Sequence, residues 1–423
     1  MPEPVPATRP APTTLIDRLP SIGLAAFWLG SRLLILGVWL NAEYIATGDV
    51  GYYFGKIANL GRVGLDQTFL EYPTPVTWIL SIPYLLSGGN QSGYIVGYVG
   101  FMIIIDAAFT IALWRAAGDR PGRAVYFWLI FIVCVGPLAY LRFDLIPAVL
   151  AGGALLALRR VPALSGVLTG IGAAIKLWPA LLIAALAAPK QARRPALIGF
   201  AVAGFGLALI SLIAGGWQRL ISPLAWQSGR GLQIESVWAT PLMLGRIGDP
   251  TTWTIDMSPY QAFEVYGPGN EIMVAISNLA TVAGLVVIVA LCIRAYRATE
   301  PSLLGIGLVM IAIVALMIIT NKTFSPQYLL WLGGPVAALG VLHRGDRRLL
   351  NLLGVSVLVL AVLTHLIYPV LYYMGLLDPQ VSAGLIAGTV VLAVRNVAIL
   401  AFTVAVCRQA WIALAPAPVR PAG

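Results

Sequence analysis

Charged residues are scarce in this sequence, and their scarcity excludes a soluble fold. Only 10% of the 423 residues are Asp, Glu, Lys or Arg, whereas 59% are hydrophobic. The mean hydropathy is +0.87. A soluble domain carries about 25% charged residues, which it needs to cover its water-facing surface. Apolar stretches near the roughly 20 residues that span a bilayer recur along the chain. We therefore expect an all-α, polytopic integral membrane protein.

Cysteine and histidine are also scarce, which argues against disulfide or metal chemistry. Cys134, Cys292 and Cys407 each lie inside an apolar segment without a near partner in sequence. This spacing is not typical of a disulfide framework or a zinc site. His343 lies in a basic loop and His365 in an apolar segment, and we interpret both as structural.

The formal net charge of +10 would suggest a nucleic-acid partner in a soluble protein. Here the basic residues lie between apolar segments, where they indicate topology and contact with anionic membrane lipid. We therefore expect membrane lipid, and no nucleic acid, as a partner.

The apolar runs predict about twelve transmembrane helices. They lie at residues 22–42, 93–115, 124–141, 144–158, 162–175, 177–189, 195–216, 272–296, 302–320, 328–342, 349–372 and 383–408. The first run is too long for the core of a signal peptide, so we expect an uncleaved first helix. Residues 22–411 then form the transmembrane domain, between cytoplasmic tails at 1–21, which is rich in proline, and at 412–423.

Five basic clusters in the loops indicate which loops share a face. They are Arg115, Arg120 and Arg123; Arg159 and Arg160; Lys190, Arg193 and Arg194; Arg294 and Arg297; and Arg344, Arg347 and Arg348. Because Lys and Arg stay in cytoplasmic loops, we place all five clusters and both termini inside. The loops at 43–92 and 217–271 are then outside. Counting residues 74–88 as a crossing would invert every later loop, so we expect a re-entrant or interfacial helix there.

The predicted outer face holds most acidic residues and three of the four lysines, Lys56, Lys176 and Lys322. A compact ammonium at the interface is a good partner for a phosphate, although such a lysine can also simply snorkel. The tryptophans of loop 217–271 suit either an interfacial loop or stacking on sugars. Segments 162–175 and 177–189 are each shorter than a full span, so their junction at Lys176–Pro179 should lie in a cavity below the outer surface.

Asp49 follows the first apolar segment in the first outer loop, between Gly48 and Gly51. A carboxylate at the membrane interface is what an inverting sugar transfer needs as a base, because it removes the proton of the attacking acceptor hydroxyl. The simpler interpretation is a helix N-cap before residues 50–60. Within the apolar segments, Arg32 and Asp106 form a candidate structural pair, and we interpret Arg395 as structural too.

Several motifs together resemble glycosyltransferase family 87, whose members are multi-spanning enzymes of the GT-C class. The motifs are Asp49 after the first helix, Glu71-Tyr72-Pro73, Arg142-Phe143-Asp144-Leu145-Ile146-Pro147, Lys176-Leu177-Trp178-Pro179 and Ser325-Pro326-Gln327-Tyr328-Leu329-Leu330-Trp331. They run in order from residue 49 to about 331. One departure is visible, because the family commonly has Tyr-Pro-Pro where this chain has Tyr72-Pro73-Thr74-Pro75. Residues 231–236 also resemble the actinobacterial members.

The resemblance implies roles for these residues. Asp49 matches the catalytic base. Arg142, Lys176 and Lys322 become candidates for the donor phosphate, and Glu71 and Asp144 for sugar hydroxyls or for orienting these cations. Three aromatic or amide side chains near them, Tyr72, Gln327 and Tyr328, are candidate substrate contacts, although helix capping and packing explain Gln327 and Tyr328 equally well.

We therefore expect a GT-C type enzyme of the plasma membrane with its active site on the extracytoplasmic face. It would transfer a hexose, with mannose favoured, from a polyprenyl-phosphate sugar to a glycolipid or lipoglycan, with inversion. The lipid-linked sugar is a co-substrate, and the scheme needs no cofactor or metal. A transferase for arabinofuranose or another lipid-linked sugar fits the same residues. A transporter or flippase of lipid-linked sugars would instead show charged residues along its central helices and pseudo-symmetric halves.

Overall fold

The computed structural model describes residues 15–118, 122–343 and 345–415. Arg120, Arg344, the predicted C-terminal tail from 416 on and residues 1–14 of the N-terminal tail lie outside the described residues. The predicted tail 1–21 overlaps the first helix, which begins at Leu15. The fold is all-α apart from one small hairpin, as the sequence predicts.

Seven helices within the described residues are long and apolar enough to cross a membrane. They are α1 (Leu15–Asn41), α5 (Gln91–Ala117), α11 (Lys190–Ser228), α13 (Asn270–Arg297), α14 (Leu303–Thr320), α16 (Arg347–His365, continued by a π-helical turn at Leu366–Val370) and α17 (Ala383–Ala413). Shorter apolar helices pack among them: α6 (Arg123–Val135), α8 (Leu145–Ala157), α9 (Pro162–Ile175), α10 (Leu182–Leu186) and α15 (Leu330–Leu342). All twelve predicted segments are therefore helical, and this is an integral membrane protein.

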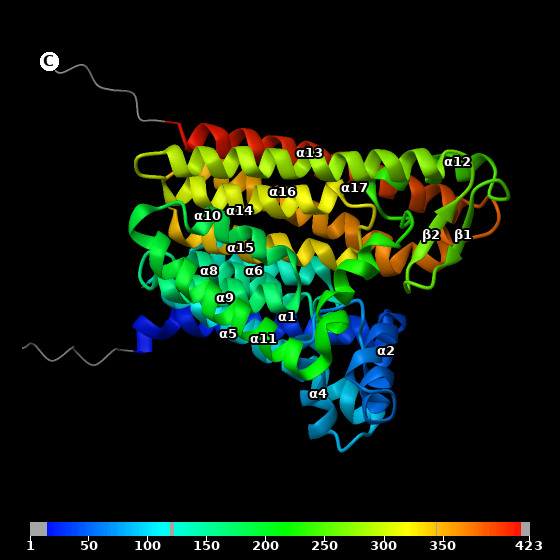
Figure 1. The fold of residues 1–423 in the computed structure, drawn as a ribbon, viewed down its shortest axis with the longest axis horizontal. Helices are drawn as coiled ribbons and strands as arrows, with labels where there is room; N and C mark the ends of the chain where they lie inside the picture. Colours follow the sequence, from blue (N-terminus) through cyan, green and yellow to red (C-terminus); the bar gives the residue numbers. More distant parts are fainter. Residues whose placement is uncertain (1–14, 119–121, 344, 416–423) are drawn as a thin grey trace, which may run out of the picture.

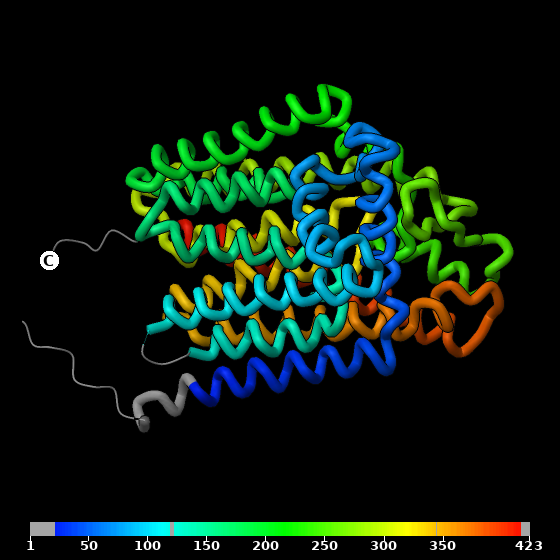
Figure 2. The backbone as a smooth tube through the Cα atoms, turned by 90° about the horizontal axis from the view of Figure 1, so that it is seen from below, coloured from blue at the N-terminus to red at the C-terminus, as the bar shows by residue number. Residues whose placement is uncertain are grey.

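The connections between helices confirm the predicted alternation. Figures 1 and 2 show both described ends of the chain at one end of the bundle, together with the loops α5–α6, α8–α9, α10–α11, α13–α14 and α15–α16. We call this end the basic end. The described members of the five basic clusters lie here: Arg115, Arg123, Arg159, Arg160, Lys190, Arg193, Arg194, Arg294, Arg297, Arg347 and Arg348.

The opposite end carries the short elements. The first loop folds into η1 (Tyr44–Thr47), α2 (Gly48–Ala58), α3 (Leu60–Val63), η2 (Leu65–Gln67) and α4 (Pro75–Leu86). Helices α2 and α4 lie at this end (Figure 1). Since α1 ends and α5 begins there, residues 74–88 do not cross the bundle, as the basic clusters predict.

The second excursion is more regular than a polar loop. Helix α11 bends at Gly216, whose φ of 76° suits glycine, and continues to Ser228. After it come η4 (Val237–Ala239), α12 (Thr240–Gly248) and the antiparallel strands β1 (Thr254–Met257) and β2 (Phe263–Tyr266), in which Thr254 pairs with Tyr266. Toward the C-terminus, η7 (Tyr372–Leu376) precedes α17, and the remaining short turns are α7 (Leu138–Leu141), η3 (Trp178–Leu181) and η5 (Pro326–Leu329).

Two kinds of contact between helices stand out within the apolar core of the bundle. Helices α9 and α11 approach at glycines, because a Cβ at Gly166 would meet the carbonyl oxygen of Ala196 at 1.9 Å and one at Gly199 that of Ala163 at 2.1 Å. Small residues at such positions allow the close backbone approach on which membrane helix packing depends. The other kind of contact is the predicted structural pair of Arg32 with Asp106, which is confirmed at 2.8 Å in a buried site. The Asp106 carboxylate also accepts hydrogen bonds from three ring donors: Trp28, Trp128 and Tyr140.

Candidate active site

Asp49 lies in the first turn of α2, at the end of the bundle opposite the basic end. Its carboxylate forms an ion pair with the Arg142 guanidinium. The residue that caps α2 is Thr47, so the interpretation of Asp49 as the N-cap is wrong. The charge still suits its place, because the first turn of a helix favours an acidic side chain. The Asp49 side chain is 32% exposed, whereas that of Arg142 is 11% exposed.

Arg142 lies in the break between α7 and α8, where its backbone is extended. Two positions later, Asp144 precedes α8 and is almost completely buried. Its Oδ1 accepts hydrogen bonds from Lys176 Nζ at 2.5 Å and from Trp331 Nε1 at 2.8 Å. The predicted outer turn therefore carries one cation and one anion side by side, and each is paired with the opposite charge from another element.

Lys176 follows the last residue of α9 and is surrounded by aromatic rings. Its Nζ lies 5.1 to 5.8 Å from the ring centroids of Tyr72, Phe143, Tyr328 and Trp331. A cation this close to ring faces is attracted by their quadrupoles. The ammonium therefore keeps a stable position although only one carboxylate contacts it.

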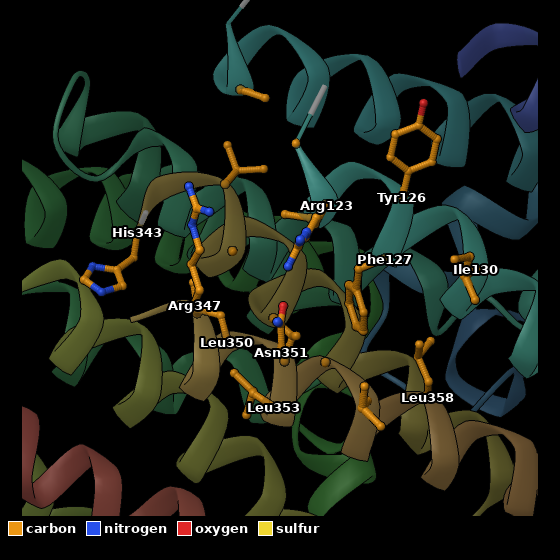
Figure 3. A pocket seen from close by; sticks show the side chains of 18 of the residues that line it. Arg123, Tyr126, Phe127, Ile130, His343, Arg347, Leu350, Asn351, Leu353 and Leu358 are labelled. Atoms are coloured by element: carbon orange, nitrogen blue, oxygen red, sulfur yellow. The ribbon is translucent and has the colours of Figure 1, made fainter. Parts of the chain in front are cut away.

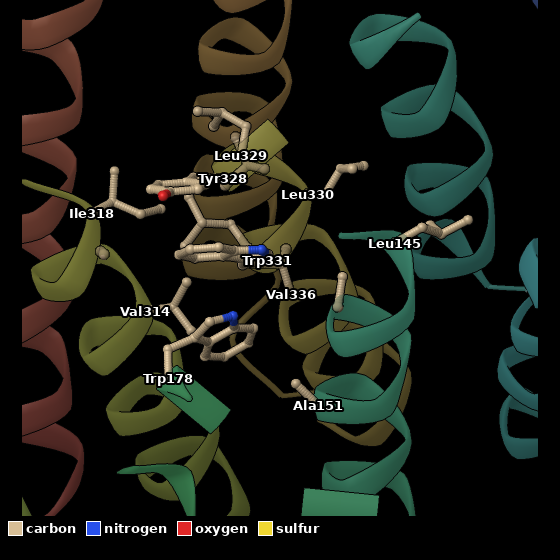
Figure 4. Close-up of a cluster of buried hydrophobic side chains, with 14 of the residues drawn as sticks. Leu145, Ala151, Trp178, Val314, Ile318, Tyr328, Leu329, Leu330, Trp331 and Val336 are labelled. Carbon is tan, nitrogen blue, oxygen red and sulfur yellow. The ribbon is translucent and has the colours of Figure 1, made fainter. Parts of the chain in front are cut away.

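The rings around Lys176 stack on one another. Tyr328 and Trp331 are parallel with centroids 4.0 Å apart, and Trp178 stacks on Trp331 at 5.1 Å. Figure 4 shows the rings of Tyr328, Trp331 and Trp178 in a column. The prediction that Tyr328 serves packing is confirmed to this extent, because its ring is a wall of the lysine site.

The site is recessed because four helices around it are short. Helices α6, α8 and α15 have 13 residues and α9 has 14, and each runs between the basic end and this cluster. At 1.5 Å per residue they reach about 20 Å, whereas the hydrocarbon core of a bilayer is about 30 Å thick. Lys176 and Asp144 therefore lie below the ends of the longer helices. The cavity expected at the junction Lys176–Pro179 stays a prediction.

Hydrogen bonds attach the first loop, residues 43–92, to the rest of the bundle near this cluster. The buried Arg219 of α11 donates to the backbone carbonyl oxygens of Leu65 at 3.2 Å and Tyr72 at 2.9 Å. Glu71 accepts a hydrogen bond of 2.7 Å from the Tyr52 hydroxyl. Burial and the Glu71 carboxylate both raise the pKa of Tyr52, which therefore remains a neutral donor. Tyr72 packs edge-on against Phe143 at 4.8 Å.

Two predicted residues do not join the cluster through a direct contact. Lys322 donates to the carbonyl oxygen of Ser228 at 3.0 Å. Burial lowers its pKa, and its charged neighbours are Glu264 and Arg230 in the 217–271 excursion. Gln327 is buried, and its Oε1 has no hydrogen-bond partner among the described residues. Because Lys322 makes no direct contact with the Asp49–Asp144 cluster, Arg142 and Lys176 are the stronger candidates for the donor phosphate.

Sequence reasoning missed several site residues. Tyr53 is fully buried beside Arg142, and burial raises the pKa of its phenol while the arginine charge opposes that shift. Tyr368 is another neighbour of Arg142. Trp331 lies three residues after Tyr328, a helical spacing that puts both side chains on one face. Of the missed residues, Trp331 is therefore the one that the sequence spacing could have identified. Nothing in the pattern around Tyr368 distinguishes it from the other rings of its apolar segment.

The arrangement offers two neutralised cations and one accessible base. Asp144 is sealed, with 1% of its side chain exposed, while Asp49 remains open to an incoming group. An anionic ligand that approaches Arg142 and Lys176 competes with the two carboxylates, and it would free Asp49 for proton transfer. Among the described residues, no group of three or more His, Cys, Asp and Glu side chains could hold a metal ion.

Comparison with known protein families places the chain in one of them. The sequence profile described as glycosyltransferase family 87 matches residues 69–320. This span is more than half of the chain, and it includes Glu71, Arg142, Asp144 and Lys176 but not Asp49. A search of curated proteins found no match. The matched span and the helical membrane fold agree: the chain belongs to glycosyltransferase family 87, and it is a membrane glycosyltransferase.

Proposed function

We propose that this enzyme transfers a hexose, with mannose as the first candidate, from a polyprenyl-phosphate sugar to a glycolipid or lipoglycan. The reaction takes place on the extracytoplasmic face of the plasma membrane and inverts the anomeric centre. The observation that carries the proposal is the pairing of an exposed carboxylate, Asp49, with a recessed cation site at Arg142 and Lys176. A lipid phosphate below the membrane surface and an acceptor hydroxyl in the aqueous headgroup region need this combination.

The reaction requires one displacement. Asp49 takes the proton of the acceptor hydroxyl as its oxygen forms a bond to the anomeric carbon. The bond from that carbon to the phosphate oxygen breaks, and its electron pair remains on the phosphate. Arg142 and Lys176 stabilise this growing negative charge. Because the lipid phosphate leaves easily, the scheme uses no general acid, no metal and no cofactor other than the lipid-linked co-substrate.

The other predicted residues take supporting positions in this scheme. Glu71 and Tyr72 border the cluster from the first loop, and their polar atoms are suitable for sugar hydroxyls. Asp144 holds Lys176 in place. Arabinofuranose or another sugar on the same lipid phosphate would meet the same cations, so the sugar is the part of the proposal that rests on family resemblance alone.

The Asp49→Asn variant provides the test. Purified protein in liposomes receives radiolabelled polyprenyl-phosphate-mannose and a membrane glycolipid. We expect transfer to fall by about 10²- to 10⁴-fold, the usual contribution of a positioned base. Asp66→Asn is the matched control, because Asp66 is an exposed acid of the same loop; it should keep wild-type activity. An unfolding midpoint must accompany each rate, since the substitution also removes the ion pair with Arg142.

The possible results separate the parts of the proposal. Undiminished transfer by Asp49→Asn excludes Asp49 as the base but leaves the transferase assignment intact. Transfer only from a different lipid-linked sugar replaces mannose. Failure with every lipid-phosphate sugar, together with movement of the lipid across the liposome membrane, would instead indicate a flippase.

A further inference from the structure

A second pocket lies at the basic end, far from Asp49 along the bundle. It has a volume of about 1060 Å³ and is lined by the end of α5, the beginning of α6, the end of α15 and the first half of α16. Ligand pockets commonly measure about 300–1,000 Å³, so this one can hold a headgroup and part of an acyl chain. We call it the basic-end pocket. The transfer reaction proposed above does not use it.

One side of the basic-end pocket is apolar. Figure 3 shows Phe127 and Ile130 of α6 facing Leu353 and Leu358 of α16. Val355, also in the lining, is 58% exposed, and Ile130 is 39% exposed. A water-facing pocket rarely leaves such side chains open, whereas a pocket that faces lipid can. This part of the pocket is therefore suited to hydrocarbon.

The other side of the pocket is positively charged. Arg123 at the beginning of α6 and Arg347 at the beginning of α16 both line it, and Asn351 lies near Arg123 (Figure 3). Neither guanidinium makes an ion pair or a side-chain hydrogen bond within the part of the chain that the structure describes. Both helices begin here, so the positive ends of their dipoles add to this charge.

The neighbouring polar groups do not neutralise the two arginines. The Asp346 carboxylate accepts a hydrogen bond from the backbone N–H of Leu349 at 2.9 Å and so caps α16. His343 Nε2 accepts a hydrogen bond from the backbone N–H of Asp346 at 3.2 Å and contributes no negative charge. Two cations without a side-chain partner among the described residues therefore border an apolar pocket, which is the charge and shape complement of an anionic lipid.

We propose that the basic-end pocket binds an anionic phospholipid of the adjacent leaflet. Its phosphate contacts Arg123 and Arg347, its polar headgroup lies near Asn351, and an acyl chain lies along Phe127, Ile130 and Leu358. A bound lipid would join α6 to α16, and α6 is one of the short helices that end at the catalytic cluster.

The test measures lipid binding by the purified full-length chain. Native mass spectrometry and the thermal unfolding midpoint are recorded with added phosphatidylglycerol or phosphatidylcholine. We expect phosphatidylglycerol to bind and to raise the midpoint, and phosphatidylcholine to do neither. The double variant Arg123→Ala/Arg347→Ala should bind phosphatidylglycerol roughly thirtyfold more weakly, as expected for the loss of two arginine contacts.

Two further variants distinguish the pocket from general surface charge. Arg159→Ala/Arg160→Ala removes two arginines at the same end outside the lining, and it should bind like wild type. Val355→Trp fills the apolar side and leaves the charges, so it should weaken phosphatidylglycerol binding too. Equal binding of phosphatidylcholine, equal loss in both double variants, or full stabilisation by glycerol phosphate alone would each overturn the proposal.

Discussion

Glu235 is a buried acidic residue whose environment could not be predicted from the sequence. It lies between α11 and η4 in a segment that resembles other family members, yet no motif gives it a role. The structure buries it completely, and neither carboxylate oxygen has a hydrogen-bond partner among the described residues. Arg395 Nη2 is 3.9 Å from its Oε2 and donates to its backbone carbonyl oxygen at 2.8 Å.

The charge state of Glu235 therefore predicts a pH dependence of stability. Burial raises the pKa of this carboxyl to about 8, although Arg395 and Arg142 oppose the shift. Between about pH 4.5 and about pH 8, the folded chain keeps a proton that the unfolded chain releases, so the free energy of unfolding falls as pH rises through this window. Glu235→Gln removes this contribution. Its thermal midpoint, relative to wild type, should rise from about pH 5 to about pH 8.5.

A control variant and a contradicting outcome complete that prediction. Asp256→Asn is a suitable control, because Asp256 is an exposed acid of the same excursion. Its midpoint should follow wild type at every pH. If the curves of Glu235→Gln and wild type run parallel across the window, then Glu235 is ionised in the folded chain and the predicted coupling is absent.

At the residue scale, the sequence identifies the charged site residues better than it identifies the ion pairs that they form. Asp49, Arg142, Asp144 and Lys176 were all predicted site residues, because a charge in an apolar sequence is conspicuous. The pairing of Asp49 with Arg142 and of Asp144 with Lys176 required the fold. Aromatic site residues are hard to recognise in the sequence for the opposite reason. Rings such as those of Tyr53 and Tyr368 occur throughout a hydrophobic chain.

At the scale of elements, the positions of the helical segments were predictable, whereas some of their lengths and all of their neighbours were not: the run 195–216 is part of α11, which spans Lys190–Ser228. The short runs at 162–175 and 177–189 correctly indicated a junction inside the bundle. The close approach of α9 to α11 depends on Gly166, Gly170 and Gly199, whose significance appears only when the facing backbone is known. In the sequence, these glycines look like the many others that contact nothing.

Enlarging Gly166 should disturb the site from a distance. A leucine there would collide with the α11 backbone at Ala196, force α9 away and move Lys176 at the end of α9. We expect Gly166→Leu to lower the thermal midpoint and to abolish transfer. Gly206→Leu on α11 is the matched control, because a Cβ at Gly206 has no neighbour within 4 Å. Wild-type stability of Gly166→Leu would show that the two helices do not need this close contact.

At the scale of the whole molecule, the basic clusters predicted the arrangement of the loops. They are reliable because translocating Lys and Arg is costly, so a chain of many helices records its orientation in each loop. The structure shows that the loops share an end (Figures 1 and 2). The side of the membrane that this end faces is a separate prediction, and it follows from the retention of Lys and Arg in the cytoplasm.

Labelling of single cysteines in intact cells tests the orientation. In a variant without the three native cysteines, Met257→Cys on the hairpin should react with a membrane-impermeant maleimide, since Met257 is 53% exposed and lies at the Asp49 end. Arg159→Cys at the basic end should react only after the cells are permeabilised. The reverse pattern would place the catalytic cluster on the cytoplasmic side and contradict the proposed localisation.

The aromatic rings around Lys176 have one more consequence, for the choice between sugar transfer and simple hydrolysis of the donor. Water is far more concentrated than any glycolipid and is small enough to attack the same anomeric carbon. Tyr72, Phe143, Tyr328 and Trp331 leave the Lys176 side chain only 16% exposed. A donor phosphate held there would be screened from solvent by hydrocarbon surface, while Asp49 stays open on the acceptor side. If the donor binds as proposed, the same enclosure that holds the cation would therefore protect it from hydrolysis by water.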